Sequence, residues 1–237
     1  SQSSLIMVDA LGGLGNKMSQ YATLLGISRR DGRVPYLNNH QHSVLSEVFP
    51  HLSIQTFPQA LLKCNLVWFQ AKVELIYGLN EYEEARVRDP DRISSLNVIL
   101  TGYPDSIEIY SSYYRELQRE FNLEAVRTAA MGTVGRLRRL RPSAQLVAVH
   151  VRRTDYIKVL RKHHQVHDYE SKEYFLAAMR LFRLRYDQCL FVVVSDDKKW
   201  CQENLLGSSD VVISDWDGKE PPTHDFGVIT ESDHAVL

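Results

Sequence analysis

The chain has 237 residues, of which 44% are hydrophobic and 24% are charged, and its formal net charge at pH 7 is −1. This composition is typical of a globular protein with one large domain or two small ones, and the balanced charge provides no general basic field for nucleic acid. Three cysteines (Cys64, Cys189 and Cys201) exclude a disulfide framework, and no apolar run approaches the roughly 20 residues of a membrane span.

The first predicted unit is a short strand at residues 5–9, a glycine-rich turn at residues 10–16 and a helix whose apolar face begins at Met18. Glycines let the backbone approach a ligand closely, and a helix N-terminus attracts anions. The alternative is a tight turn that binds nothing, since the spacing matches neither the P-loop nor the dinucleotide fingerprint. Asn16 favours a ligand, because its amide can donate a hydrogen bond where the helix begins.

The rest of the first half predicts a parallel sheet. Residues 32–37 lead into a second strand, which completes a strand–helix–strand rhythm, and residues 97–103 form another strand. Residues 106–114 either offer aromatic faces to a sugar or begin a helix with aromatic core residues, and we expect the core role for Tyr114. The basic segment 135–142 indicates a helix end with solvated arginines rather than a nucleic-acid patch, and we expect the domain boundary there.

The most informative stretch is the valine-rich run at residues 146–151, which predicts a buried strand and leads directly into Arg152 and Arg153. The planar guanidinium of arginine is well suited to binding phosphate. In an open α/β sheet, ligands bind beyond the carboxyl ends of the strands. The stretch therefore predicts an anionic, phosphorylated ligand at the end of this strand.

A second buried strand, at residues 189–194, also ends in polar side chains, those of Ser195, Asp196 and Asp197. The two aspartates are adjacent, so in extended chain they point in opposite directions. They could bind a divalent ion, but a helix cap is the interpretation that we expect for Asp197.

Between these two strands, residues 157–168 contain three histidines, His163, His164 and His167. A metal site is one interpretation, because histidines three residues apart on a helix can ligate one ion. No cysteine or glutamate stands at a matching spacing, so we expect a polar loop over a cleft instead. The chain ends in a strand at residues 234–237, which should continue into a loop that completes the ligand site.

Five blocks of the sequence, in order, resemble motifs of the α-1,2-fucosyltransferases, glycosyltransferase family eleven. The first begins Gly-Gly-Leu-Gly-Asn and resembles the family's Gly-x-Leu-Gly-Asn-Gln-Met motif, with Lys17 in place of the glutamine. The strand end His-Val-Arg-Arg-Thr-Asp-Tyr resembles its His-x-Arg-Arg-x-Asp-Tyr motif. The blocks lie at residues 12–22, 102–113, 150–156, 195–201 and 225–234. Together they extend over nearly the whole chain.

The resemblance implies an α/β fold of the GT-B type, with two Rossmann-like domains facing a cleft. Residues 1–142 would form the acceptor-side domain, and residues 143–237 an incomplete, C-terminally truncated GDP-fucose-binding domain. The implied reaction is an inverting, metal-independent transfer of fucose from GDP-fucose to the 2-hydroxyl of a galactose-containing glycan. The implied location is the Golgi membrane with a lumenal catalytic domain for a eukaryotic source, the anchor preceding this chain, and the cytoplasm for a bacterial one.

The resemblance also implies the site residues. Arg152 and Arg153 would bind the diphosphate and act in catalysis, Arg153 above all, since arginine can stabilise the leaving GDP in place of a metal. The other donor-binding residues implied are Gly13, Asn16, His150, Asp155, Ser195, Asp196, Asp225 and Phe226. No metal ligand, cofactor or nucleic-acid partner is implied, and no motif singles out a carboxylate as the base.

Two other functions stay open at this point. One is a GDP-fucose-dependent fucosyltransferase with a different acceptor. The other is a catalytically silent relative that binds a nucleotide or a glycan.

Overall fold

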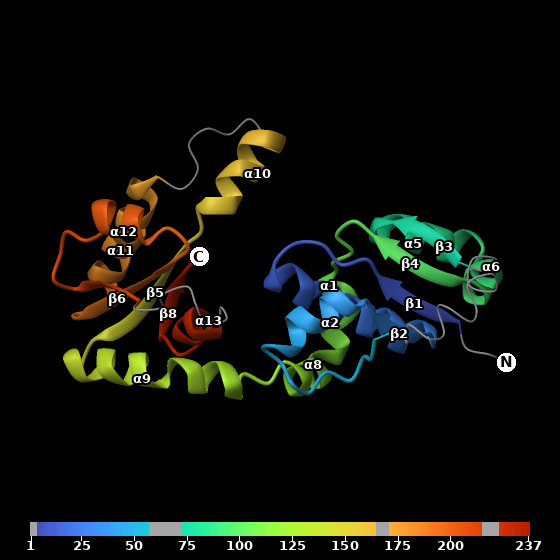
Figure 1. Ribbon diagram of the computed structural model, residues 1–237, viewed down its shortest axis with the longest axis horizontal. Coiled ribbons are helices and arrows are strands. Elements are labelled where there is room, and N and C mark those ends of the chain that lie inside the picture. The colour runs from blue at the N-terminus through green and yellow to red at the C-terminus, as the bar shows by residue number, and fades with distance from the viewer. Residues whose placement is uncertain (1–3, 57–72, 165–170, 215–222) are drawn as a thin grey trace. The chain divides into compact units, whose positions relative to one another are not determined.

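The computed structural model describes residues 4–56, 73–164, 171–214 and 223–237 (Figure 1). It forms two compact units, Ser1–Asn122 and Leu123–Leu237, and each is built on a four-stranded parallel sheet. The division falls before the boundary expected at residue 142, because the helix at residues 124–140 packs on the second sheet. No helix in the described part of the chain is long and apolar enough to cross a membrane.

The sheet of the first unit has the strand order β2–β1–β4–β3, and every neighbouring pair of strands is parallel. The strands are β1 (Leu5–Val8), β2 (Val34–Leu37), β3 (Val73–Tyr77) and β4 (Asn97–Thr101). Ile6, Val8 and Leu100 are fully buried, so the core runs along the central strands β1 and β4. This sheet confirms the parallel arrangement that the strand–helix–strand rhythm predicts.

The helices of the first unit connect and flank these strands. They are α1 (Leu14–Asp31), α2 (Asn39–Ser46), α5 (Gly78–Arg88), α6 (Pro90–Ser95), α7 (Ile107–Tyr110), the 3-10 turn η1 (Ser111–Tyr113) and α8 (Tyr114–Glu120). The expected core role of Tyr114 is wrong, because α8 begins at this residue and its side chain is 60% exposed. The buried contacts of α8 begin at Leu117.

The sheet of the second unit has the order β7–β6–β5–β8, again with parallel pairing throughout. The strands are β5 (Gln145–Val151), β6 (Cys189–Ser195), β7 (Val211–Ile213) and β8 (His234–Val236). The buried strand predicted from the valine-rich run is confirmed as β5, a central strand. β6, beside it, is buried at every position.

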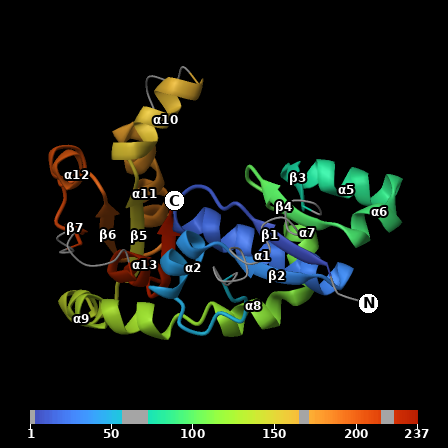
Figure 2. The same ribbon diagram turned by 45° about the vertical axis from the view of Figure 1, so that its right-hand side comes forward.

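Helices cover both faces of this second sheet (Figure 2). They are α9 (Glu124–Leu140), α11 (Lys172–Arg185), α12 (Lys198–Asn204) and α13 (Thr223–Thr230), whereas α10 (Thr154–His164) follows β5 and extends away from the sheet. Alternate β5 side chains belong to different clusters: Val147 packs with residues of α11 and α12, whereas Ala148 packs with residues of α9 and α13. Burial on both faces explains why β5 and β6 are continuous apolar runs.

Candidate functional site

The glycine-rich turn after β1 is held by side chains of α1 itself. The Nζ atom of Lys17, a residue only 3% exposed, donates to the carbonyl oxygen of Gly12. The side chain of Gln20 bonds both backbone groups of Leu11, with each hydrogen bond 3.1 Å long. Lys17, the departure from the family pattern, is therefore part of the turn's own structure.

Gly12 cannot carry a side chain at this position. Its φ is 82°, in the region that glycine favours, and an added Cβ would lie 2.1 Å from the amide nitrogen of Asn16. Asn16 and Gly13 are both exposed, Gly13 as the N-cap residue of α1. The turn thus presents the exposed amide of Asn16 beside a helix N-terminus.

In the second unit, Arg152 emerges from the end of β5 and turns to Asp155 in the first turn of α10. Its Nε and Nη2 atoms lie 3.0 and 2.5 Å from the two carboxylate oxygens of Asp155, and its guanidinium lies 5.4 Å from the ring centre of Tyr156. The hydrogen bond from Arg152 lowers the pKa of Asp155 below its usual range. The charge of Arg152 is thus shared with an aspartate at the surface.

Arg153 has different surroundings. Its guanidinium carbon lies 4.0 Å from the ring centre of Trp200 in α12. Its Nε atom lies 3.6 Å from Asp197, too far for a hydrogen bond, and within the described residues this buried nitrogen has no hydrogen-bond partner. The side chain is only 18% exposed. An arginine that is stacked but incompletely hydrogen-bonded can still donate to an anion.

Asp196 fixes the backbone that carries Arg153. Its two oxygens accept the backbone N–H groups of Arg153 and Thr154 at 2.8 and 3.0 Å, and the Thr154 hydroxyl also donates to it. The carboxylate therefore caps the start of α10 from the neighbouring strand. A polar loop was expected at residues 157–168, but residues 157–164 belong to α10, and residues 165–168 lie outside the described part.

The residues on either side of Asp196 are also placed by hydrogen bonds. Asp197 accepts the N–H of Trp200 at 3.1 Å, which confirms its predicted role as the cap of α12. Ser195 is buried, and its hydroxyl accepts the N–H of Asp197 at 2.9 Å. Asp197, which caps α12, and Trp200, which stacks on Arg153, thus lie together at the start of the same helix.

Asp225 joins α13 to the end of β7. It accepts the hydroxyl of Ser214 at 2.6 Å and lies 3.2 Å from Nδ1 of His224. The Ser214 carbonyl in turn accepts Lys198 Nζ at 2.7 Å, and Nε2 of His224 lies 3.0 Å from the hydroxyl of Thr133. Asp225 therefore belongs to a network of polar groups that links α9, α12, α13 and β7.

The expected site residues of the second unit lie at or near the carboxyl ends of its strands. Arg152, Arg153 and Asp155 surround the β5 end, Ser195 and Asp196 the β6 end, and Asp225 is linked to the residue after β7. His150 and Phe226 are half-buried, His150 on β5 and Phe226 on α13. Gly13 and Asn16 belong to the first unit.

Sequence reasoning missed Trp200, Lys198, Ser214 and His224 as contributors. An aromatic residue three positions after a capping aspartate was a signal for Trp200, and a serine directly after a short strand was a signal for Ser214. The described residues contain no group of three histidine, cysteine or acidic side chains placed to hold a metal ion. His167 and the side chains of His163 and His164 lie outside the described part.

Two solved structures are similar to the chain. One is a mutant of Arabidopsis thaliana FUT1 in complex with GDP, 11% identical with a TM-score of 0.50, covering 100% of this chain and 66% of that one. The other is the fucosyltransferase NodZ from Bradyrhizobium, 14% identical with a TM-score of 0.51, covering 96% and 83% respectively. These likenesses confirm an α/β fold of the GT-B kind.

Curated relatives are closer in sequence. Galactoside 2-alpha-L-fucosyltransferase SEC1 of Bos taurus is 33% identical over 97% of this chain and 60% of that protein. Galactoside alpha-(1,2)-fucosyltransferase 2 of Sus scrofa is 34% identical over 97% of the chain and 65% of its own length. The chain thus spans less than two thirds of these relatives. The family model Glycosyl transferase family 11 matches residues 1–237, and the chain therefore belongs to this family of glycosyltransferases.

Proposed function

We propose that the protein transfers fucose from GDP-fucose to the 2-hydroxyl of a galactose-containing glycan, with inversion and without a metal ion. The galactoside fucosyltransferases among the relatives support the acceptor, and the GDP bound to the similar plant structure supports the donor. For a eukaryotic source, a Golgi location belongs to the same proposal.

The observation that carries this proposal is that Arg153 is stacked on an aromatic ring but incompletely hydrogen-bonded. It lies at the carboxyl end of β5, stacked on Trp200, with a buried Nε atom that has no hydrogen-bond partner in the described residues. In the proposed step, the acceptor hydroxyl attacks C1 of fucose from the face opposite the GDP. The bond from C1 to the β-phosphate oxygen breaks, GDP leaves with the electron pair, and the hydroxyl proton passes to a base or to water.

Negative charge develops on the leaving diphosphate in this step, and a fixed guanidinium stabilises that charge. Arg153 would supply the main donor and Arg152 a second one, while Asp196 holds the backbone of the arginine pair. Asn16, Gly13, His150, Ser195, Asp225 and Phe226 remain proposed donor-binding residues on the family resemblance. Asp155 and Asp196 would act through the arginines and the start of α10.

Titration calorimetry with GDP tests the site. Arg153→Ala should weaken GDP binding by roughly ten- to a hundredfold, the size expected when a hydrogen bond to a charged group is lost, and it should abolish transfer. Arg180→Ala, which removes an exposed arginine from α11 of the same unit, is the matched control. Wild-type GDP affinity in Arg153→Ala would refute the role of this arginine.

The reaction is tested by offering GDP-fucose and a galactose-terminated oligosaccharide after treatment with EDTA. Transfer should continue at the untreated rate, and the linkage of the product should be α-1,2. A loss of transfer that Mn²⁺ restores would overturn the metal-free mechanism. GDP binding without transfer to any of a panel of glycans would instead identify a nucleotide-binding relative.

A further inference from the structure

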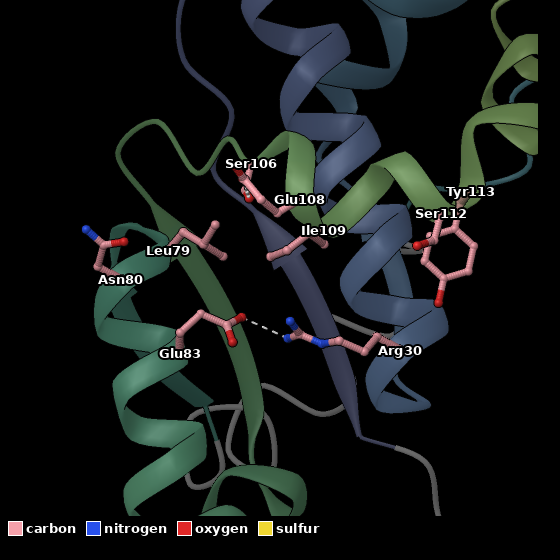
Figure 3. A pocket seen from close by; sticks show the side chains of 9 residues that line it. All are labelled: Arg30, Leu79, Asn80, Glu83, Ser106, Glu108, Ile109, Ser112 and Tyr113. Atoms are coloured by element: carbon pink, nitrogen blue, oxygen red, sulfur yellow. Dashed lines mark hydrogen bonds and ion pairs between the residues drawn. The ribbon is translucent and has the colours of Figure 1, made fainter.

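The first unit contains a pocket of about 430 Å³ between α1, α5 and the segment from Ser106 to η1 (Figure 3). Its lining residues are Arg30, Leu79, Asn80, Glu83, Ser106, Glu108, Ile109, Ser112 and Tyr113. α5 begins directly after β3, and the Ser106 segment follows β4. Two walls of the pocket are therefore chain that leaves the carboxyl ends of two neighbouring parallel strands, and the third wall is the last turn of α1, which carries Arg30.

One end of the pocket is fixed by an ion pair. Figure 3 shows Glu83 of α5 and Arg30 of α1 reaching toward each other, and their closest nitrogen and oxygen atoms are 2.8 Å apart. Arg30 also bonds Asp31 through two nitrogens at 2.7 and 2.8 Å, and Glu83 bonds Arg86. The charge of Arg30 is thus balanced within the protein.

The other end is fixed by the packing of α7 on α1. The N–H of Ser106 donates to the Thr23 hydroxyl at 3.1 Å, and the Ser106 hydroxyl donates to Glu108 at 2.6 Å. α7 approaches α1 at Gly26, where an added Cβ would lie 2.7 Å from a methyl carbon of Ile109. These contacts hold the pocket walls in place, so a ligand would bind with little loss of conformational freedom.

The chemistry of the lining suits a neutral polyhydroxylated ligand. Arg30, Glu83 and Glu108 together carry a net charge of −1, which disfavours phosphate and other anions. Carboxylate oxygens, the Asn80 amide and the Ser112 hydroxyl can accept from or donate to sugar hydroxyls. Leu79, Ile109 and the ring of Tyr113 supply apolar surface for the C–H face of a sugar ring.

The pocket is suited to binding a sugar, and its Glu108 is poorly suited to activating one. The hydrogen bond from Ser106 lowers the pKa of Glu108 below its usual range, whereas a base for a hydroxyl works best with a pKa near the operating pH. The volume lies within the roughly 300–1,000 Å³ of small-molecule sites, which is room for a small part of a glycan.

We propose that this pocket binds a neutral sugar unit of the acceptor glycan, one other than the galactose that receives fucose. This proposal rests on the proposed function, because it takes the glycan acceptor from it. The pocket would then contribute to the choice between long and short acceptors, with Glu108 and Asn80 as the residues that determine specificity.

The test compares methyl β-galactoside with a galactose-terminated tetrasaccharide as acceptors. Glu108→Gln and Asn80→Ala change exposed side chains and should leave the fold intact. Each should lower the ratio of kcat/KM for the tetrasaccharide to kcat/KM for the galactoside by roughly fivefold to twentyfold, as expected for one lost hydrogen bond. Glu84→Gln, the neighbouring exposed carboxylate of α5 that does not line the pocket, should keep the wild-type ratio.

Saturation-transfer NMR with the unreacted tetrasaccharide separates this proposal from the proposed function. The contacts of the non-galactose units should disappear in Glu108→Gln and persist in Glu84→Gln, whether or not transfer occurs. Loss of these contacts in a protein that transfers no fucose would support the pocket and refute the proposed function. Normal transfer with an unchanged ratio and unchanged contacts in both pocket variants would refute the pocket alone.

Discussion

The stacking of Arg153 on Trp200 predicts that this tryptophan controls GDP binding without touching GDP. Trp200→Leu removes the ring but keeps an apolar side chain beside Phe175, whose ring centre lies 6.3 Å from that of Trp200. The Arg153 guanidinium lies 4.0 Å from the indole centre, and its side chain is 18% exposed. A cation–π contact in such a partly desolvated place contributes about 1–2 kcal/mol, so the Kd for GDP should rise roughly 5- to 30-fold.

Titration calorimetry on a double-mutant cycle measures this effect. If Trp200 acts through Arg153, Trp200→Leu should weaken GDP binding in the wild-type background and have no further effect in Arg153→Ala. Trp200→Phe, which keeps an aromatic face, should retain much of the GDP affinity that Trp200→Leu loses. Lys199→Ala is an exposed control in the same helix. An equal loss in both backgrounds would mean that Trp200 supports the site through general packing, and it would refute a specific role for the stacking contact.

Two further predictions concern stability. Asp155→Asn should destabilise the protein near neutral pH, and the difference from the wild type should vanish in acid. Arg152 lowers the pKa of Asp155 in the folded protein, so the stabilisation is present above the unfolded pKa of about 3.9 and is lost as the pH falls through the folded pKa. Urea midpoints at several pH values measure the difference in stability, and a difference that grows in acid would contradict this prediction. Gly227→Ala should cost about 1–3 kcal/mol, because the new Cβ would lie 2.2 Å from the Val126 carbonyl oxygen of α9. Gly132→Ala, where nothing lies within 4 Å, should be neutral or stabilise α9 by up to about 1 kcal/mol, and equal urea midpoints for these two variants would show that the α9–α13 packing adapts.

The position of the arginine pair follows from the sequence, because strand burial and strand ends are local properties. The run at residues 146–151 alternates between two cores, and the polar residues begin where that burial stops. What the sequence leaves open is the partner of each arginine. Arg152 bonds Asp155, three residues away in the first turn of α10, whereas the stacking partner of Arg153 is 47 residues away on α12 and depends on the pairing of β5 with β6.

Asp196 and Asp197 also differ in whether their partners can be predicted from the sequence. A cap three residues from its partner is readable from the sequence, and Asp197 is such a cap. Asp196 caps a helix that begins 42 residues earlier, so only the register of the sheet reveals the contact. The division into units falls before α9 and not at residue 142, where the basic segment ends. The basic residues mark the end of α9, but its apolar face, with Val134 and Leu137, belongs to the second core.

The different partners of the two arginines bear on how an anion would engage them. A diphosphate that approaches Arg152 competes with a bidentate carboxylate for the same nitrogens, so part of any gain is offset by the bonds lost to Asp155. The competition at Arg153 is weaker, because Asp197 lies 3.6 Å from its Nε atom, beyond hydrogen-bonding distance, and Trp200 contacts the guanidinium through its ring. Its orientation is set before the ligand arrives, by the indole on one side and by the carboxylate of Asp196 on its backbone N–H. A preorganised donor of this kind stabilises developing charge without reorganising, which is the physical reason for assigning the larger catalytic part to Arg153.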